Sequence, residues 1–276
     1  MIVFRSPVVS LMPDLTPSNL RSKANGLINF MGGVGAAVSL YFGAFLYNID
    51  PSIPFIFFSI VLVIIILLYL WKIKEPEQVE KEEKMNLITI IKDIFKLLDR
   101  NILFILLAIF FWFFGFSGVE TFFTLYGKNF LYISESLASQ RLAFFSVSFL
   151  LLAIPSGYLA SKIGRKRTIC TGISGLLLVF ILLIYLRNIN HITYCLLLGG
   201  VFWALININS YPMIVDSSEG KIGTLTGIYY FFSTLPAILS PMVVGKIIEM
   251  AGYGTLFITA SISLILSLFF MIKVKQ

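Results

Sequence analysis

Long runs of hydrophobic residues alternate with short polar segments along this chain of 276 residues. A bilayer core about 30 Å thick requires roughly 20 apolar residues per helix. Backbone polar groups in lipid need partners within their own segment, so such runs predict helices rather than strands. The eight long runs lie at 24–48, 53–73, 102–127, 140–160, 168–187, 193–215, 223–248 and 253–273, and a shorter apolar stretch covers 1–12. The pattern predicts an all-α fold, a multi-pass membrane helical bundle.

One long polar stretch, 74–101, separates the second run from the third. Its first part, EPEQVEKEEK at 75–84, is a mixed-charge linker that cannot bury a core. At 87–98, Leu and Ile recur at helical spacing opposite Lys and Asp, which indicates an amphipathic helix on the membrane surface. We therefore expect three parts: a first group of helices in 1–73, the linker 74–101, and a six-helix bundle in 102–276.

The composition supports insertion into a lipid bilayer. Hydrophobic residues make up 58% and charged residues 13% of the chain, too few charges to cover a water-soluble globule. The net charge of +7 could suggest nucleic acid, but the basic residues gather at the ends of the apolar runs. We therefore expect no nucleic-acid partner.

The distribution of Lys and Arg predicts the orientation in the cell membrane. If the segment 13–23 is cytoplasmic, 16 of the 21 basic residues lie on the cytoplasmic side and three on the other side. Cytoplasmic loops carry the excess of Lys and Arg in membrane proteins. The linker and the C-terminus are therefore predicted to be cytoplasmic.

The chain also contains a repeat at a constant offset of 201 residues. The matching pairs are Gly26 and Gly227, Phe30 and Phe231, Ala36 and Ala237, and Ser39 and Ser240. A parallel repeat in an apolar chain predicts two similar helical bundles, an organisation found in many secondary transporters.

The residue types that bind metals are scarce. Cys170 and Cys195 are predicted near opposite membrane faces, too far apart for a disulfide. The single histidine, His191, has no Cys or carboxylate cluster beside it. We expect no metal site and no cofactor.

A short basic hairpin joins two of the predicted spans. It reads GYLASKIGRKR from Gly157 to Arg167, with a second glycine at Gly164 and the cations Arg165 and Lys166 after it. The hairpin resembles the signature loop of the major facilitator superfamily, G-x-x-x-D-R/K-x-G-R/K-R/K. Ser161 stands where that family usually has Asp, which removes a carboxylate from the loop.

The resemblance implies a register along the whole chain. The eight spans match helices 5 to 12 of twelve, so the expected fold is a major facilitator fold lacking helices 1–3 and most of helix 4. Three segments also resemble the sugar/cation symporter branch, which includes sucrose carriers and bacterial relatives. They are Trp112–Tyr126, Val201–Asp216 and Ile222–Leu239.

The resemblance further implies which residues act as a gate. In the hairpin these are Gly157, Gly164, Arg165 and Lys166. Two charged hinges complete the expected set: Asp14 with Arg21 between helices 4 and 5, and Asp216 between helices 10 and 11.

Glu120 is the candidate coupling residue, because it is the one carboxylate well inside a predicted span. An ionisable group there is costly and usually faces a cavity. It shares a helix face with Ser117 and Thr124, beside Trp112, and both Glu120 and Trp112 are candidates for contact with the solute. We expect Glu120 to be buried and to exchange a proton during transport; the alternative is a structural pair with Arg141 or Lys128.

Four further residues are candidates for contact with a solute. Asn207 shares a helix face with Trp203, an amide beside an aromatic platform that suits a hydroxylated ligand. The alternative for Asn207 is an interhelical hydrogen bond. Tyr229 belongs to a polar stripe that includes Ser233, and Asn29 lies on a stripe of small and polar residues.

The sequence therefore favours a secondary active transporter of a small polar solute, for example a sugar coupled to protons or another cation, working as a monomer by alternating access. The alternatives are an efflux carrier for amphipathic compounds, which 27 phenylalanines would suit, and an inactive fragment of a carrier. An enzyme is not expected, because membrane enzymes display clustered Asp, His or Cys at the interface.

Overall fold

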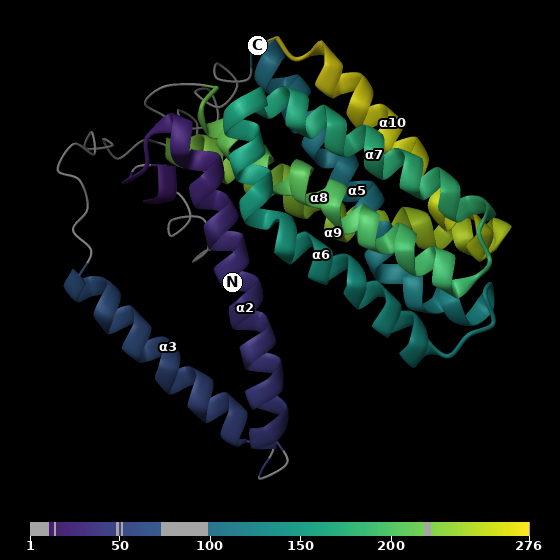
Figure 1. The fold of residues 1–276 in the computed structure, drawn as a ribbon, viewed down its shortest axis with the longest axis horizontal. Coiled ribbons are helices and arrows are strands. Elements are labelled where there is room, and N and C mark those ends of the chain that lie inside the picture. Colours follow the sequence, from purple (N-terminus) through teal and green to yellow (C-terminus); the bar gives the residue numbers. More distant parts are fainter. Residues whose placement is uncertain are drawn as a thin grey trace.

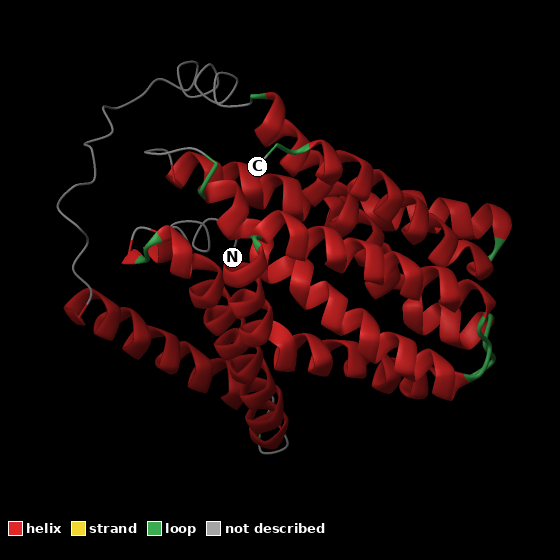
Figure 2. Cartoon of the chain, turned by 45° about the horizontal axis from the view of Figure 1, so that its top comes forward, coloured by secondary structure: helices red, strands yellow, loops and turns green. Residues whose placement is uncertain are grey.

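The computed structural model describes residues 11–13, 15–47, 50, 52–72, 99–217 and 222–275. The described part is all-helical, as predicted (Figure 2). Its helices are η1 (Ser18–Leu20), α2 (Arg21–Tyr47), α3 (Ile53–Lys72), α5 (Arg100–Asn129), α6 (Glu135–Ile163), α7 (Arg165–Tyr185), α8 (Ile189–Val215), α9 (Ile222–Ala251), η2 (Tyr253–Thr255) and α10 (Leu256–Lys273).

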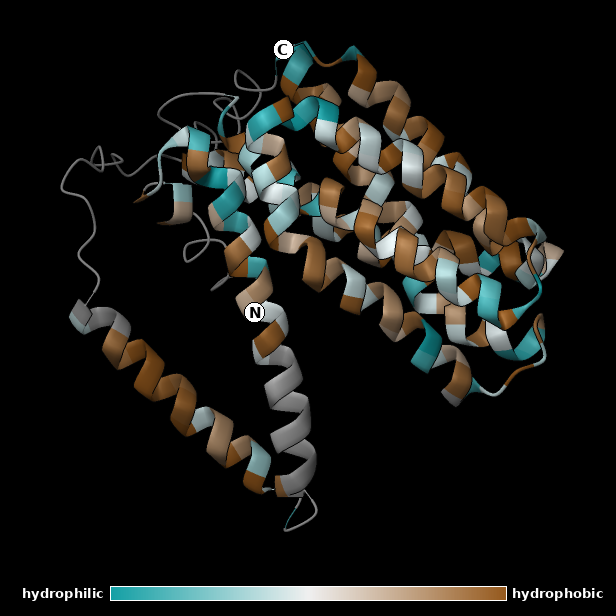
Figure 3. Cartoon of the chain, in the orientation of Figure 1, coloured by the Kyte–Doolittle hydropathy of each residue, from teal (hydrophilic) through white to brown (hydrophobic). Residues whose placement is uncertain are grey.

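Among the described residues, six helices are long and apolar enough to cross a membrane, from α5 to α10. They match the last six predicted runs, and α2 and α3 match the first two. The apolar residues lie along the lengths of the helices, and polar residues gather toward the helix ends (Figure 3). The predicted multi-pass bundle is confirmed.

The six helices α5 to α10 pack into one bundle. Helix α5 packs against α9 and α10, α6 against α8, and α7 against α8 and α10. Large aromatic side chains fill its interior without exposure, among them Phe123, Phe180 and Phe257. Because lipid tails are as apolar as leucine, close packing and hydrogen bonds between helices hold such a bundle together.

Small hydroxyl side chains supply several of these hydrogen bonds. Ser240 on α9 donates to the Phe114 carbonyl on α5 at 2.7 Å, and Ser267 on α10 donates to the Ala108 carbonyl at 3.0 Å. On α8, the Asn209 amide donates to Ser156 Oγ of α6 at 3.0 Å.

Helices α2 and α3 lie to one side of this bundle (Figure 1). Helix α2 packs against α6 and α8, and α3 packs against α2. In both views α2 approaches α6 near its own first residues and lies away from the bundle at its far end.

Only the last residues of the predicted linker are described. The amphipathic helix predicted at 87–98 lies outside the described residues. Helix α5 begins at Arg100, slightly before the predicted end of the linker, because the Asp99 side chain accepts a hydrogen bond from the Ile102 amide at 2.7 Å and caps the helix.

Candidate functional site: a charged junction between α2 and the six-helix bundle

The ends of α6, α8 and α10 and the starts of α2, α5 and α7 meet at one end of the molecule, which we call the charged end. The turn between α6 and α7 is a single residue, Gly164, at φ 91°. A left-handed backbone suits glycine, and it places Arg165 directly at the start of α7.

Asp216 is the centre of the charged end. It caps the C-terminus of α8, and its carboxylate forms ion pairs with Arg21 at the start of α2 and with Arg165. Ser18 also donates to this carboxylate, at 2.6 Å. Side-chain exposure is only 14% for Asp216, 15% for Arg21 and 19% for Arg165. One carboxylate therefore joins α2 to the six-helix bundle.

Both arginines are held by further hydrogen bonds. Arg21 donates to the carbonyl oxygens of Thr16 at 3.1 Å and Pro13 at 2.9 Å. Arg165 crosses to the α2 side, where it donates to Ser22 Oγ at 2.9 Å and to the Ser18 carbonyl. Charge-assisted bonds of this kind are stronger than neutral ones and fix the side chains in place.

Gly157 permits close contact between α2 and α6 at the same end. A Cβ atom at Gly157 would lie 2.3 Å from the Ser22 carbonyl oxygen, and one at Gly26 would lie 2.6 Å from the Ala153 carbonyl oxygen. Side chains larger than hydrogen would push the two backbones apart.

Lys166 lies beside this junction but does not cross it. Its ammonium donates to the carbonyl oxygen of Ile272, in the last turn of α10, at 3.2 Å. It also donates to the carbonyl oxygen of Val274, directly after α10, at 2.6 Å. Lys166 therefore ties α7 to α10 inside the six-helix bundle. Asp14, the other expected member of the gate, lies outside the described residues.

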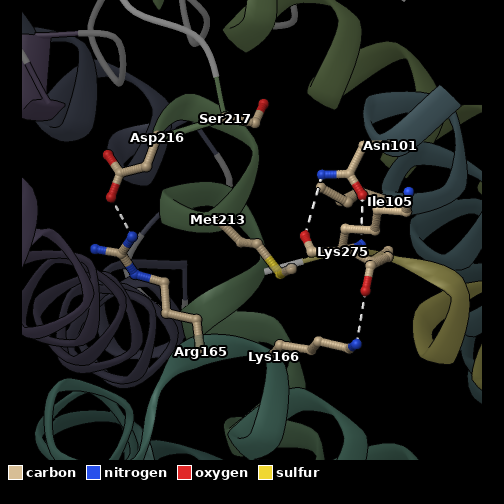
Figure 4. A pocket seen from close by; sticks show the side chains of 9 residues that line it. Asn101, Ile105, Arg165, Lys166, Met213, Asp216, Ser217 and Lys275 are labelled. Atoms are coloured by element: carbon tan, nitrogen blue, oxygen red, sulfur yellow. Dashed lines mark hydrogen bonds and ion pairs between the residues drawn. The ribbon is translucent and has the colours of Figure 1, made fainter. Parts of the chain in front are cut away.

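A pocket of about 400 Å³ opens at the charged end (Figure 4). Asn101 and Lys275 close one side of it, joined by two hydrogen bonds at 2.6 and 3.2 Å. Its lining residues are Asn101, Ile105, Arg165, Lys166, Met213, Asp216, Ser217, Val274 and Lys275.

The predicted aromatic platform, Trp203 on α8, is covered. The Phe116 ring from α5 stacks on it with centroids 4.1 Å apart, and Phe113 meets it edge-on at 5.4 Å. Trp203 is consequently 4% exposed. Trp112 is fully buried in the core, so it presents no surface to a solute in this conformation.

The polar candidates for solute contact on α8 and α9 differ in burial and in hydrogen bonding. Asn207 is half-buried, and no side chain among the described residues bonds its amide group. Tyr229 is buried, and its hydroxyl lies 3.0 Å from Ser210 Oγ. One residue further along α8, the Tyr211 hydroxyl lies 2.9 Å from Thr226 Oγ1.

Glu120 is exposed, so the prediction that it is buried was wrong. Glu120 lies on the same face of α5 as Phe113 and Phe116, at helical spacing. Those two rings contact Trp203, but the same face is exposed at Glu120. The alternative, an ion pair with Arg141 or Lys128, is not seen among the described residues: Lys128 pairs with Glu135, and Arg141 Nε has no hydrogen-bond partner.

On α2, Asn29 donates to the Asn25 carbonyl oxygen at 2.8 Å and to Asn25 Oδ1 at 3.2 Å. Asn25 in turn donates to the Ile208 carbonyl oxygen on α8 at 2.6 Å. The sequence pattern did not predict the contacts of Asn25, Ser18, Ser22 and Phe116. Asn25 lies one helical turn after Arg21, a spacing that could have drawn attention to it.

Among the residues that the structure describes, no three of the His, Cys, Asp and Glu side chains come together as a metal site. Cys170 and Cys195 are both free thiols.

Comparisons with known proteins were consistent with this architecture. The family model of the Major Facilitator Superfamily matches residues 3–241 and 128–276. A crystal structure of the transporter FucP in the outward conformation has a TM-score of 0.81 at 12% identity, and the match covers 98% of this chain and 72% of that one. A variant of the E. coli fucose:proton symporter FucP has a TM-score of 0.79 at 12% identity, covering 98% and 73%. None of the curated proteins compared matches the sequence. On the family match, the chain belongs to the major facilitator superfamily.

Proposed function

We propose that this chain moves a small polar solute across a membrane by alternating access, with the charged end as one gate. The observation that carries the proposal is the pairing of Asp216 with Arg21 and Arg165. These ion pairs connect α2 to α7 and α8 and can form in one conformation and break in another.

The path of α2 supports a cavity beyond this gate. Arg21, Asn25, Asn29 and Gly32 follow one another on one helix face. Arg21 and Asn25 contact residues at the end of α8, whereas a Cβ atom at Gly32 would have no neighbour within 4 Å. This face of α2 therefore contacts α8 near the charged end and has open space beside it further along the helix.

For the solute surface we propose Asn207, Trp203, Tyr229 and Asn29, with Trp203 released when Phe116 moves. Amides and hydroxyls beside aromatic rings suit a hydroxylated ligand. One structurally similar protein is a fucose:proton symporter, which favours a sugar among the polar solutes. The finer assignment to a sugar/cation symporter of bacterial, sucrose-carrier-like type belongs to this proposal.

We propose Glu120 as the group that couples solute movement to protons. Its carboxylate is exposed on the α5 face that carries Phe113 and Phe116. An ionisable side chain inside a span is costly against lipid, so this face is expected to line a water-filled or ligand-filled space.

An efflux carrier for amphipathic compounds is the second candidate. The aromatic cluster favours it: Phe116 contacts both Trp203 and Phe145, with centroids 4.1 and 5.5 Å apart. Such a surface would bind a flat apolar ring through stacking.

We propose the cell membrane as the location, with the charged end, the linker 74–101 and the C-terminus in the cytoplasm. The parts 1–73 and 102–276 would be the two moving units of a monomer. The basic residues serve topology and gating in this proposal, so it includes neither nucleic acid nor an enzyme activity.

The test is solute uptake by the whole chain in proteoliposomes. Radiolabelled fucose and sucrose should enter in preference to a lipophilic cation, and Asp216→Asn should change the rate. Preferred uptake of the lipophilic cation would support efflux instead. Uptake of neither class would support the third possibility, an inactive fragment of a carrier.

A further inference from the structure

Proline 212 lies inside α8, one turn before the end of that helix. Proline has no backbone N–H, so it cannot donate to the carbonyl four residues earlier. In α8 that carbonyl belongs to Ile208, which is fully buried. A buried carbonyl without a donor is costly, so it needs a partner from elsewhere.

The partner comes from α2. Asn25 Nδ2 donates to the Ile208 carbonyl oxygen at 2.6 Å, and Asn25 is only 6% exposed. Asn29 donates to Asn25 Oδ1 at 3.2 Å, so the amide oxygen is occupied and the amide nitrogen faces α8.

The other prolines inside the described helices differ. Past the first turn of a helix, they are Pro155 in α6, and Pro236 and Pro241 in α9. No side chain among the described residues donates to the carbonyls that these three leave free, those of Leu151, Phe232 and Ala237.

We infer that Pro212 and Asn25 form a latch. Pro212 leaves the Ile208 carbonyl without a donor in its own helix, and Asn25 on the other proposed moving unit supplies that donor when the charged end closes. The latch lies between the proposed gate and the open space at Gly32. It therefore stabilises the closed charged end from within, at a position more deeply buried than the ion pairs of Asp216. The inference rests on the proposed alternating access.

The latch predicts an unusual relationship between two substitutions. Asn25→Ala leaves the Ile208 carbonyl without a donor in the closed state only, so it favours opening. Pro212→Ala restores an N–H at residue 212 in both states. Alone, this change removes part of the advantage of closure and favours opening slightly. In the Asn25→Ala background it satisfies the orphaned carbonyl and favours closure again.

The experiment measures the distance between spin labels at Asn19 and Ser161, which are exposed on η1 and at the end of α6 and line one pocket at the charged end. The full chain, with Cys170→Ala and Cys195→Ala, is studied in lipid nanodiscs. Asn25→Ala should raise the ratio of open to closed molecules about five- to 150-fold, the range for one buried acceptor left without a donor. Adding Pro212→Ala should reverse most of that rise.

Pro236→Ala is the matched control, because it also removes a helix proline. Its effect should be the same with and without Asn25→Ala. If Asn25→Ala does not fold, Asn25→Leu keeps a similar volume without the donor and enters the same comparison.

The proposal of a latch is contradicted if Asn25→Ala leaves the ratio of open to closed molecules unchanged. It is also contradicted if Pro212→Ala changes that ratio equally with and without Asn25→Ala. Either result leaves alternating access intact, since two distances are still seen. A single distance in all variants would contradict both the latch and the proposed function.

Discussion

Arg21 and Asp216 are separated by 195 residues in the sequence, and their side chains form an ion pair at the charged end. Arg21 begins α2 and Asp216 caps α8. The pair therefore joins two helices that belong to different proposed moving units. Removing Asp216 leaves Arg21 and Arg165 without their anionic partner, whereas removing Arg21 leaves Asp216 paired with Arg165 alone.

Asp216→Asn should weaken closure of the charged end by about 1–3 kcal/mol, because two arginines lose their anionic partner. We expect a cysteine at Ala160, a buried residue near the junction, to react with a maleimide several-fold faster. Glu249→Gln is the control, since Glu249 pairs with Lys246 on the exposed surface. Equal labelling rates in the unsubstituted background, Asp216→Asn and Glu249→Gln would show that Asp216 does not hold the gate closed.

Gly157→Ala and Gly35→Ala make the same chemical change in different surroundings. The new Cβ at Gly157 would lie 2.3 Å from the Ser22 carbonyl oxygen, whereas nothing lies within 4 Å of a Cβ at Gly35. Gly157→Ala should lower the free energy of unfolding by about 1–3 kcal/mol. Gly35→Ala should raise it by about 0.5–1 kcal/mol, because alanine favours helix. Thermal unfolding in detergent measures both, and an equal effect of the two changes would argue against close α2–α6 contact.

Hydropathy predicted the helices well because the bilayer fixes their length and excludes other structures. The ends were harder to predict. Helix α7 was expected at 168–187 and occupies Arg165–Tyr185, because Gly164 alone makes the turn and the basic residues after it join the helix. Local residue types show that a turn is near but not how few residues it uses.

The candidate site was less predictable, since it depends on which side chains meet. Trp203 was expected to be an open platform, but Phe116 from another helix covers it. Glu120 was expected to be buried because of its depth in a span, yet its face of α5 is uncovered. The contact of Asn25 with Ile208 requires the approach of α2 to α8, which no pattern within either segment specifies.

Lys166→Met should loosen the end of α10 without opening the gate. Lys166 donates to the carbonyls of Ile272 and Val274, and both lose a charged donor. We expect faster hydrogen exchange at residues 272–275 and unchanged maleimide labelling at Ala160. Arg167→Met, at an exposed neighbouring position, should change neither. Faster labelling of the cysteine at position 160 in Lys166→Met would show that Lys166 contributes to closing the gate.

The proposed orientation can be tested with an impermeant thiol reagent on intact cells. In a chain without its native cysteines, a cysteine at Asn190 should react, since this exposed residue lies at the end opposite the charged end. A cysteine at Ser161 should react only after the cells are opened. Reaction at Ser161 in intact cells would reverse the orientation.

Glu120→Gln tests coupling most directly, because glutamine keeps the shape and hydrogen-bonding capacity of the side chain but cannot carry a proton. If Glu120 couples solute to protons, the variant should lose accumulation against a gradient while solute exchange across the membrane continues. Proteoliposomes with an imposed pH gradient measure the first, and equal solute on both sides measures the second. Glu135→Gln is the control, because Glu135 is an exposed carboxylate paired with Lys128 at the end opposite the charged end. A Glu120→Gln variant that still concentrates solute would show that another group couples transport. Loss of both exchange and accumulation would instead assign Glu120 to solute binding, since a group needed only for coupling leaves exchange intact.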